Sequence, residues 1–164
     1  MEKKVYSGKG DAGSTVDFQG KRVGKDDLRI MALGKIDALQ AVIDLTLLRA
    51  AGKEKEILEQ IQKKLWQTAG EISCASKECI IDPVQENDIT TMERFIDSLG
   101  EPPKKFIRFN TAESIALNEC RIRCRELETY LVKLLKSKKI RPVVYKYINR
   151  LSTLFFMAAY ARIK

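Results

Sequence analysis

The residues TAESIALNECRIRCRELETYLVKLLKS, at positions 111–137, carry the clearest structural signal in this sequence. Thr111 is a favourable helix N-cap, and Ser114 follows it in the first turn. Apolar side chains then recur every three or four residues: Cys120, Cys124, Leu127, Leu131 and Leu134. This spacing places them on one face of an α-helix. We therefore predict a long helix from Thr111 to about Ser137 that packs through this face.

Four other stretches have the same periodicity and predict further helices. The expected ranges are about 26–51, 53–76, 88–100 and from 142 to at least 158. An aspartate at 26 or 27 can cap the first of these helices, and Gly52 can end it. The third is expected to begin at Asp88 or Thr90. Pro142 suits the first turn of the last helix.

Neither a strand-like alternation nor an internal repeat is evident, so the predicted fold class is all-α. We expect one domain over residues 1–164, made of a glycine-rich arm (1–25) and a five-helix bundle (26–164). Irregular segments at 79–85 and 101–110 connect the longer helices. Because the other links are short, neighbouring helices should run antiparallel.

The composition is that of a globular protein, with 45% hydrophobic and 32% charged residues. No run approaches the roughly 18 apolar residues that a membrane span needs. The N-terminus MEKKVYSGKG lacks the apolar core of a signal peptide. We therefore expect a cytoplasmic protein with no membrane partner, whose four cysteines are reduced thiols.

The chain contains no histidine, which excludes Ser-His and Cys-His nucleophile pairs and imidazole acid–base catalysis. Its net charge of +8 favours an anionic partner, either nucleic acid or a triphosphate. Cys120 and Cys124 fall on the apolar face of the 111–137 helix, so buried thiols are the favoured interpretation. A zinc site that also uses Cys74 and Cys79 is the alternative, although their spacing is not that of a CxxC motif.

Residues 6–25, YSGKGDAGSTVDFQGKRVGK, have the chemistry of a loop that wraps a polyanion. Glycines allow close approach of the backbone, Ser14 and Thr15 supply hydroxyls, and four basic side chains supply charge. Neither a GxxxxGK[ST] nor a GxGxxG motif is present. The alternative is a plain polar arm. If the segment binds ATP, we expect it to be mobile alone and ordered over the nucleotide.

Arg121, Arg125 and Glu128 share the polar side of the 111–137 helix, about 100° from its apolar face. Two arginines one turn apart can hold phosphate oxygens, with an acid beside them to orient one guanidinium. A solvated, salt-bridged helix surface is the alternative interpretation. In the last helix, the polar pair Asn149-Arg150 interrupts an apolar run, which is also unusual for plain surface.

Four segments together resemble the ATP:cob(I)alamin adenosyltransferases, in particular the trimeric five-helix type of propanediol metabolism and cobalamin salvage. They are YSGKGDAGSTVDFQGKRVGKDDLRI, ALGKIDALQ, LNECRIRCRELE and YINRLS. The resemblance covers nearly the whole chain, in the right order and spacing. Its most specific parts are Gly10-Asp11-x-Gly13-x-Thr15 before Arg22-Val23, and Asn149-Arg150-Leu151-Ser152 after a tyrosine.

This resemblance implies a left-handed bundle that forms a homotrimer with active sites between subunits. The arm would close over ATP, with Lys25 at its phosphates, while Arg121 and Arg125 hold the triphosphate. Asp37 would pair with Arg121 across the subunit interface, and Phe106 would lie beside the corrin and keep cobalamin four-coordinate. The implied nucleotide contacts are Ser7, Gly10, Asp11, Gly13, Ser14, Thr15, Arg22, Lys25, Arg121, Arg125, Glu128 and Asn149.

The implied reaction is attack of cob(I)alamin on the 5′ carbon of ATP, giving adenosylcobalamin and triphosphate, with Mg²⁺ bridging phosphates. It needs no general base, which suits a chain without histidine. The resemblance also implies a flavoprotein or other reductase that supplies cob(I)alamin, and an adenosylcobalamin-dependent enzyme as a possible recipient.

Several positions depart from the family pattern. Glu126 stands where the family has an arginine, and Arg123 cannot replace it because it lies about 200° around the helix. Asp17 stands where the family has an apolar residue. The remaining departures are Ala38, Gln40, Phe109-Asn110-Thr111 and Thr153. Two alternatives therefore stay open: a non-catalytic relative that carries or senses nucleotide or cobalamin, and a basic helical nucleic-acid-binding protein, for which no motif is present.

Overall fold

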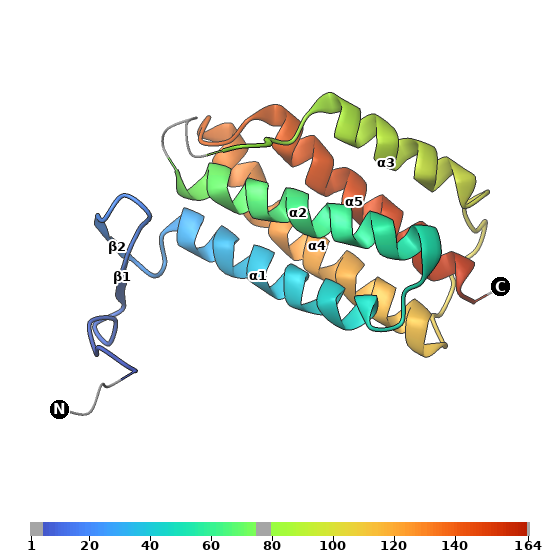
Figure 1. Ribbon diagram of the computed structural model, residues 1–164, viewed down its shortest axis with the longest axis horizontal. Coiled ribbons are helices and arrows are strands. Elements are labelled where there is room, and N and C mark those ends of the chain that lie inside the picture. Colours follow the sequence, from blue (N-terminus) through green and yellow to red (C-terminus); the bar gives the residue numbers. More distant parts are fainter. Residues whose placement is uncertain (1–4, 75–79, 164) are drawn as a thin grey trace.

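Five helices and one short hairpin make up the computed structural model, which describes residues 5–74 and 80–163 (Figure 1). The helices are α1 (Leu28–Leu47), α2 (Gly52–Ser73), α3 (Glu86–Ser98), α4 (Ala112–Lys136) and α5 (Pro142–Ala161). The strands of the hairpin are β1 (Ser14–Val16) and β2 (Arg22–Gly24). The prediction of a five-helix, all-α protein is confirmed, with a minor two-stranded sheet added to it.

The helices form one bundle, and the hairpin lies beyond one of its ends (Figure 1). α1 packs on α2 and α4, while α5 packs on α4 and α3. Fully buried side chains from every helix fill the core, among them Ile36, Leu65, Ile89, Leu127 and Phe155. The predicted apolar face of α4 is buried along its whole length, so α4 is held on one side and free to present polar groups on the other.

Two predicted helix ends are wrong. α1 already ends at Leu47, and Gly52 begins α2 with a φ of +54° instead of ending α1. The short link between the two helices requires this positive φ, which glycine adopts without strain. α3 begins at Glu86, ahead of both predicted starts, because the Gln85 N–H donates to Asp88 Oδ2 at 2.8 Å and fixes an earlier first turn.

The hairpin in the arm was missed because three-residue strands are too short to show alternation. β1 and β2 pair antiparallel, with Thr15 opposite Val23. Asp17 shapes the turn, since its Oδ1 accepts from the N–H of Gln19 at 3.0 Å and of Lys21 at 2.9 Å. The aspartate that departs from the family pattern therefore has a structural role in this chain.

Cys120 and Cys124 are buried free thiols, as predicted. Burial raises the pKa of Cys120 to about 11 and raises the pKa of Cys124 well above its ordinary value, so neither is a reactive thiolate. Cys74 is disulfide-bonded, so the prediction of four reduced thiols is wrong here, because composition does not reveal which sulfurs come within bonding distance. Cys79 lies outside the described residues.

Two searches of the described residues bear on the remaining alternatives. Residues 5–74 and 80–163 contain no cluster of three histidine, cysteine or acidic side chains that would hold a metal ion. Over the same ranges, no helix combines the length and the apolar character that crossing a bilayer demands.

We expect Asp27→Ala to lower the free energy of unfolding by about 1 kcal/mol at pH 7. Asp27 Oδ1 accepts from the Arg29 N–H at 2.8 Å at the start of α1, and this bond lowers the pKa of Asp27 below 3.8. The contribution is present above the unfolded pKa and is lost as the pH falls through the lower folded pKa. Urea unfolding at several pH values measures both effects.

Asp27→Asn is the matched control, because it keeps the acceptor oxygen but cannot ionise. It should retain most of the stability at pH 7 and lose less than wild type on acidification. An alanine variant as stable as wild type at pH 7 would contradict this role of Asp27.

Candidate functional site

The solvent side of α4 presents two arginines one helical turn apart. Arg125 is exposed and has no hydrogen bond or ion pair with any described residue. Arg121 is half-buried, and its Nε donates to Asn118 Oδ1 at 2.8 Å. Burial lowers the pKa of Arg121, and the positive charge of Arg125 lowers it further. An anion bound between the two guanidiniums would relieve their repulsion.

A pocket of about 460 Å³ opens beside Arg121, between the connection before α4 and the side chains of α4 and α5. Phe106 lies at this pocket with its side chain fully exposed. Below it, Phe109 packs edge-on against Phe156, with 6.2 Å between ring centroids. The aromatic predicted to face the corrin and an arginine predicted to hold phosphate therefore share one pocket. Asn118 also lines it, and the sequence analysis missed this residue.

Glu128 offers an unpaired oxygen one turn beyond Cys124 on α4. Its Oε1 is buried and has no hydrogen-bond partner among the described residues. A buried carboxylate oxygen without a donor is costly, so a hydroxyl or amine of a bound molecule would stabilise it. On α5, Asn149 is exposed, and its side chain makes no hydrogen bond with the described part of the chain. Both predicted nucleotide-contacting groups are therefore available to a ligand.

Asp37 lies exposed on α1. Within residues 5–74 and 80–163 of one chain, it forms no ion pair with Arg121. The single chain thus leaves both members of the predicted inter-subunit pair facing solvent or a ligand pocket.

The hairpin gathers the predicted nucleotide contacts of the arm. The Lys25 N–H donates to Gly13 O at 2.9 Å, and Gly13 has a φ of +74°, which favours glycine. Lys25 Nζ lies against Gly10, where a Cβ would come within 3.2 Å of it. The Arg22 guanidinium donates to Lys9 O at 2.7 Å. The other predicted contacts lie in the same segment: Ser7, Asp11, Ser14 and Thr15.

Within one chain, the arm does not cover the arginines of α4. The hairpin lies beyond the end of the bundle at which α1 begins (Figure 1). Its turn faces Arg29 of α1 and Ile72 of α2 across a pocket of about 270 Å³. The predicted nucleotide-contacting residues therefore form two groups, one in the arm and one on α4 and α5.

Glu126 is neutralised by cations from two helices. Its Oε2 lies 3.0 Å from Lys35 Nζ on α1 and 3.3 Å from Arg123 Nη1 on α4. The hydrogen bond from Lys35 lowers the pKa of Glu126. The acid that replaces a family arginine is therefore part of an α1–α4 ion-pair cluster and does not oppose Arg125 as a free charge.

Other departures from the family pattern are structural. Thr111 caps α4 by accepting from the Ser114 N–H at 3.1 Å. The backbone O of Gln40 accepts from Gln62 Nε2 at 2.9 Å, which ties α1 to α2. Nothing in the structure explains Ala38 or Thr153.

Comparison with known proteins gives consistent results. The sequence pattern of the family described as cobalamin adenosyltransferase matches residues 5–162. The corrinoid adenosyltransferase PduO of Citrobacter freundii is 32% identical, over 96% of this chain and 49% of that protein. The chain therefore spans about half the length of the PduO proteins it matches. A corrinoid adenosyltransferase of Bacillus subtilis is 33% identical, over 95% of this chain and 84% of that protein.

Solved structures show the same likeness. A variant of the PduO-type ATP:corrinoid adenosyltransferase from Lactobacillus reuteri, complexed with cobalamin and ATP, superposes with a TM-score of 0.84 at 28% identity. The match covers 97% of this chain and 90% of that chain. A second variant of the same enzyme, complexed with ATP, gives a TM-score of 0.82 at 27% identity. The similarity thus includes the arm as well as the bundle.

Proposed function

Because the chain belongs to the cobalamin adenosyltransferase family, we propose that it transfers the 5′-deoxyadenosyl group of ATP to cob(I)alamin. The observation that carries this proposal is the position of Arg121. This residue neighbours Arg125 on one side and lines the Phe106 pocket on the other. A triphosphate held by the arginines would therefore lie next to a flat apolar molecule in the pocket, as the reaction requires.

The reaction makes one bond and breaks one bond. The cobalt of cob(I)alamin supplies an electron pair to the 5′ carbon of ATP, and the C5′–O bond breaks as triphosphate leaves with its own pair. Negative charge grows on the leaving oxygen, so preorganised cations accelerate the step. Arg121, Arg125 and Lys25 would supply them, with Mg²⁺ on the phosphates. No proton needs to be removed, in keeping with a site without histidine.

The remaining polar groups would orient the nucleoside. The unpaired Oε1 of Glu128 would accept a hydrogen bond from a hydroxyl or amine, and the Asn149 amide would contact the nucleotide from α5. Phe106 would pack on one face of the corrin. Its complete exposure in the single chain is what a side chain that waits for an apolar ligand would show.

We propose that the protein works as a homotrimer, with the arm and Asp37 of one subunit completing the site of the next. Two observations support this. The arm does not reach Arg121 and Arg125 in its own chain (Figure 1). In addition, α1 and α4 expose apolar side chains that a partner would cover, among them Leu45 and Ile115, with 65% and 53% of their surface exposed. The sites would then lie between α1 of one subunit and α4 of another.

The chemistry also defines partners by class. Cob(I)alamin is a strong reductant, so a flavoprotein or other reductase has to supply it, and an adenosylcobalamin-dependent enzyme would take the product. We propose the cytoplasm as the location, where ATP and such a reductase are both available.

One assay tests the proposal. ATP, Mg²⁺ and chemically reduced cobalamin are mixed with the protein, and adenosylcobalamin formation is followed by its absorption spectrum. We expect catalytic turnover that depends on the protein. Binding of ATP or cobalamin without turnover would instead identify a carrier or sensor, the candidate that the acid at Glu126 favours. Absence of both kinds of binding would reject the proposed function.

We expect Mg-ATP to protect the arm from proteolysis. Residues 6–25 bury little apolar surface by themselves, so ligand contacts should supply much of their order. Cleavage near Lys9, Lys21 or Arg22 by trypsin should be fast in the free protein and slow with Mg-ATP. Cleavage at Lys138, on the far side of the bundle core from the arm's turn, serves as an internal control. Equal cleavage of the arm with and without Mg-ATP would show that it is a plain tail.

A further inference from the structure

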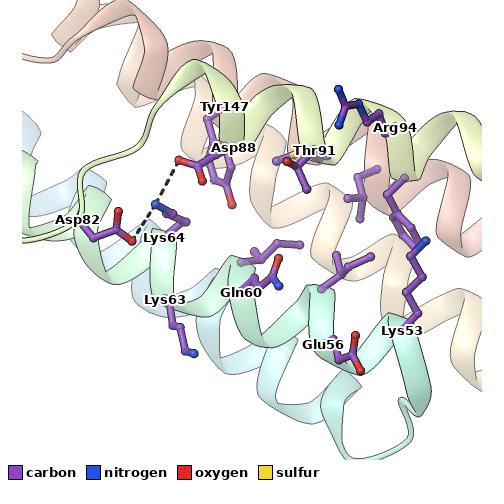
Figure 2. Close-up of a pocket in the computed structure, with 15 residues that line it drawn as sticks. Lys53, Glu56, Gln60, Lys63, Lys64, Asp82, Asp88, Thr91, Arg94 and Tyr147 are labelled. Atoms are coloured by element: carbon purple, nitrogen blue, oxygen red, sulfur yellow. Dashed lines mark hydrogen bonds and ion pairs between the residues drawn. The ribbon is translucent and has the colours of Figure 1, made fainter.

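A second pocket, larger than the one at Phe106, lies between α2, α3 and α5 (Figure 2). Its volume is about 580 Å³, which is within the range of roughly 300–1,000 Å³ typical of small-molecule sites. It exists because α3 packs on α5 and α2 packs on α1, which leaves a hollow between α2 and α3.

This pocket is separate from the proposed adenosylation site. α5 contributes Tyr147 and Leu154 to it, two residues that are seven apart and so share one face of the helix. Asn149 and Phe156, which belong to the proposed site, come two residues later and therefore point about 200° away. The two sites lie on opposite faces of the same helix.

The interior of the pocket is apolar. Its walls are formed by side chains from all three helices: Ile57, Ile61, Met92, Phe95 and Leu154. These groups favour a ligand with an aliphatic or aromatic body over a polyphosphate.

Tyr147 supplies a hydrogen-bond donor inside this apolar space. The residue is only 3% exposed, and its hydroxyl points into the pocket (Figure 2). No described residue forms a hydrogen bond with that hydroxyl. A buried phenol normally has a partner, so the pocket is suited to a molecule that brings an acceptor to this point.

Charged side chains around the pocket are unevenly matched. At one end, Lys64 Nζ is held by Asp82 at 2.9 Å and Asp88 at 3.1 Å, so these three groups satisfy one another (Figure 2). Lys53 lies at the other end, with its Nζ 5.7 Å from the centre of the Phe95 ring.

Among the other charged residues that line the pocket, Lys63 and Arg94 add two further cations against one acid, Glu56. No ion pair within the described chain occupies Lys53, Lys63 or Arg94. The free end of the pocket therefore favours an anion.

We propose that this pocket binds a small organic anion: a carboxylate or sulfonate on an apolar body, with Lys53 near the anionic group and the Tyr147 hydroxyl donating to an acceptor. The proposal is independent of the adenosylation chemistry. Since α5 carries both sites, such a ligand would contact the helix that positions Asn149.

The test uses 8-anilinonaphthalene-1-sulfonate as a fluorescent probe and decanoate as its competitor, without ATP or cobalamin. We expect saturable binding of one probe per chain, displacement by decanoate, and much weaker displacement by the uncharged 1-decanol. Methyl NMR shifts at Ile57, Ile61 and Met92 on addition of decanoate would locate the site.

Three variants decide between this pocket and other sites. Thr91→Trp should block the pocket and abolish binding. Lys53→Gln and Tyr147→Phe should each weaken it roughly tenfold, as the loss of one hydrogen bond to a charged group does. Lys55→Gln is the matched control, because Lys55 lies on α2 outside the pocket and pairs with Glu59. Near-UV circular dichroism checks that each variant is folded. Binding that survives Thr91→Trp in a folded protein, or that does not distinguish decanoate from decanol, would overturn the proposal.

Discussion

Replacing Arg125 with alanine is expected to lower kcat/KM for ATP by roughly 10- to 150-fold for each hydrogen bond lost to phosphate. Arg125 is exposed and unpaired among the described residues, so its removal breaks nothing within the chain. Its guanidinium would bind most tightly to the leaving triphosphate, whose charge increases in the transition state. We therefore expect a fall in kcat as well as a rise in KM. Steady-state kinetics and a thermal unfolding scan measure activity and folding together.

Arg123→Ala is the matched control for this prediction. Arg123 lies two residues away on the same helix but forms ion pairs with Glu119 at 2.8 Å and Glu126 at 3.3 Å. Its loss should affect activity little. Arg125→Lys should retain part of the activity, because lysine keeps the charge but not the forked geometry. If Arg125→Ala and Arg123→Ala have equal activity in folded proteins, Arg125 does not bind triphosphate.

Asp37→Arg is expected to convert the trimer into monomers and to reduce adenosylation at least about 100-fold, as loss of correct positioning can. The substitution would place two arginines against each other at the proposed interface. Arg121→Asp should have the same effect on assembly. Analytical ultracentrifugation at micromolar protein gives the oligomeric state.

The double variant Asp37→Arg with Arg121→Asp restores opposite charges and should reassemble, although without the phosphate contact of Arg121 it should stay less active. Glu59→Arg, on the outer face of α2, is the control for a charge reversal elsewhere. A wild-type protein that sediments as a monomer, or a single variant that remains trimeric, would contradict this interface.

The helices could be predicted because their apolar residues follow the helical period closely. In α4 the whole stripe from Cys120 to Leu134 is buried, as the spacing indicated. The start of α3 could not be predicted, since it depends on the hydrogen bond between Gln85 and Asp88. Strands of three residues give no periodic signal, so the pairing of Thr15 with Val23 also required the structure.

The candidate site was predictable where it lies on one helix. The spacing of Arg121 and Arg125 already indicated a shared face, and the structure places both on the solvent side of α4. Contacts between helices could not be inferred, because they depend on how neighbouring helices are aligned. The bond between Lys35 and Glu126 and the hollow around Tyr147 are of this kind.

The order of the helices along the chain has a consequence for how the protein folds. α1 and α2 are joined by residues 48–51, and α4 and α5 by residues 137–141, so each pair can close with little loss of chain entropy. Packing of α1 on α4 instead brings together segments that are far apart in the sequence, which is slower. We therefore expect the two helix pairs to form early and their docking to limit the refolding rate. The arm takes no part in that step, so changes in residues 6–25 should alter ligand binding while leaving the refolding rate unchanged.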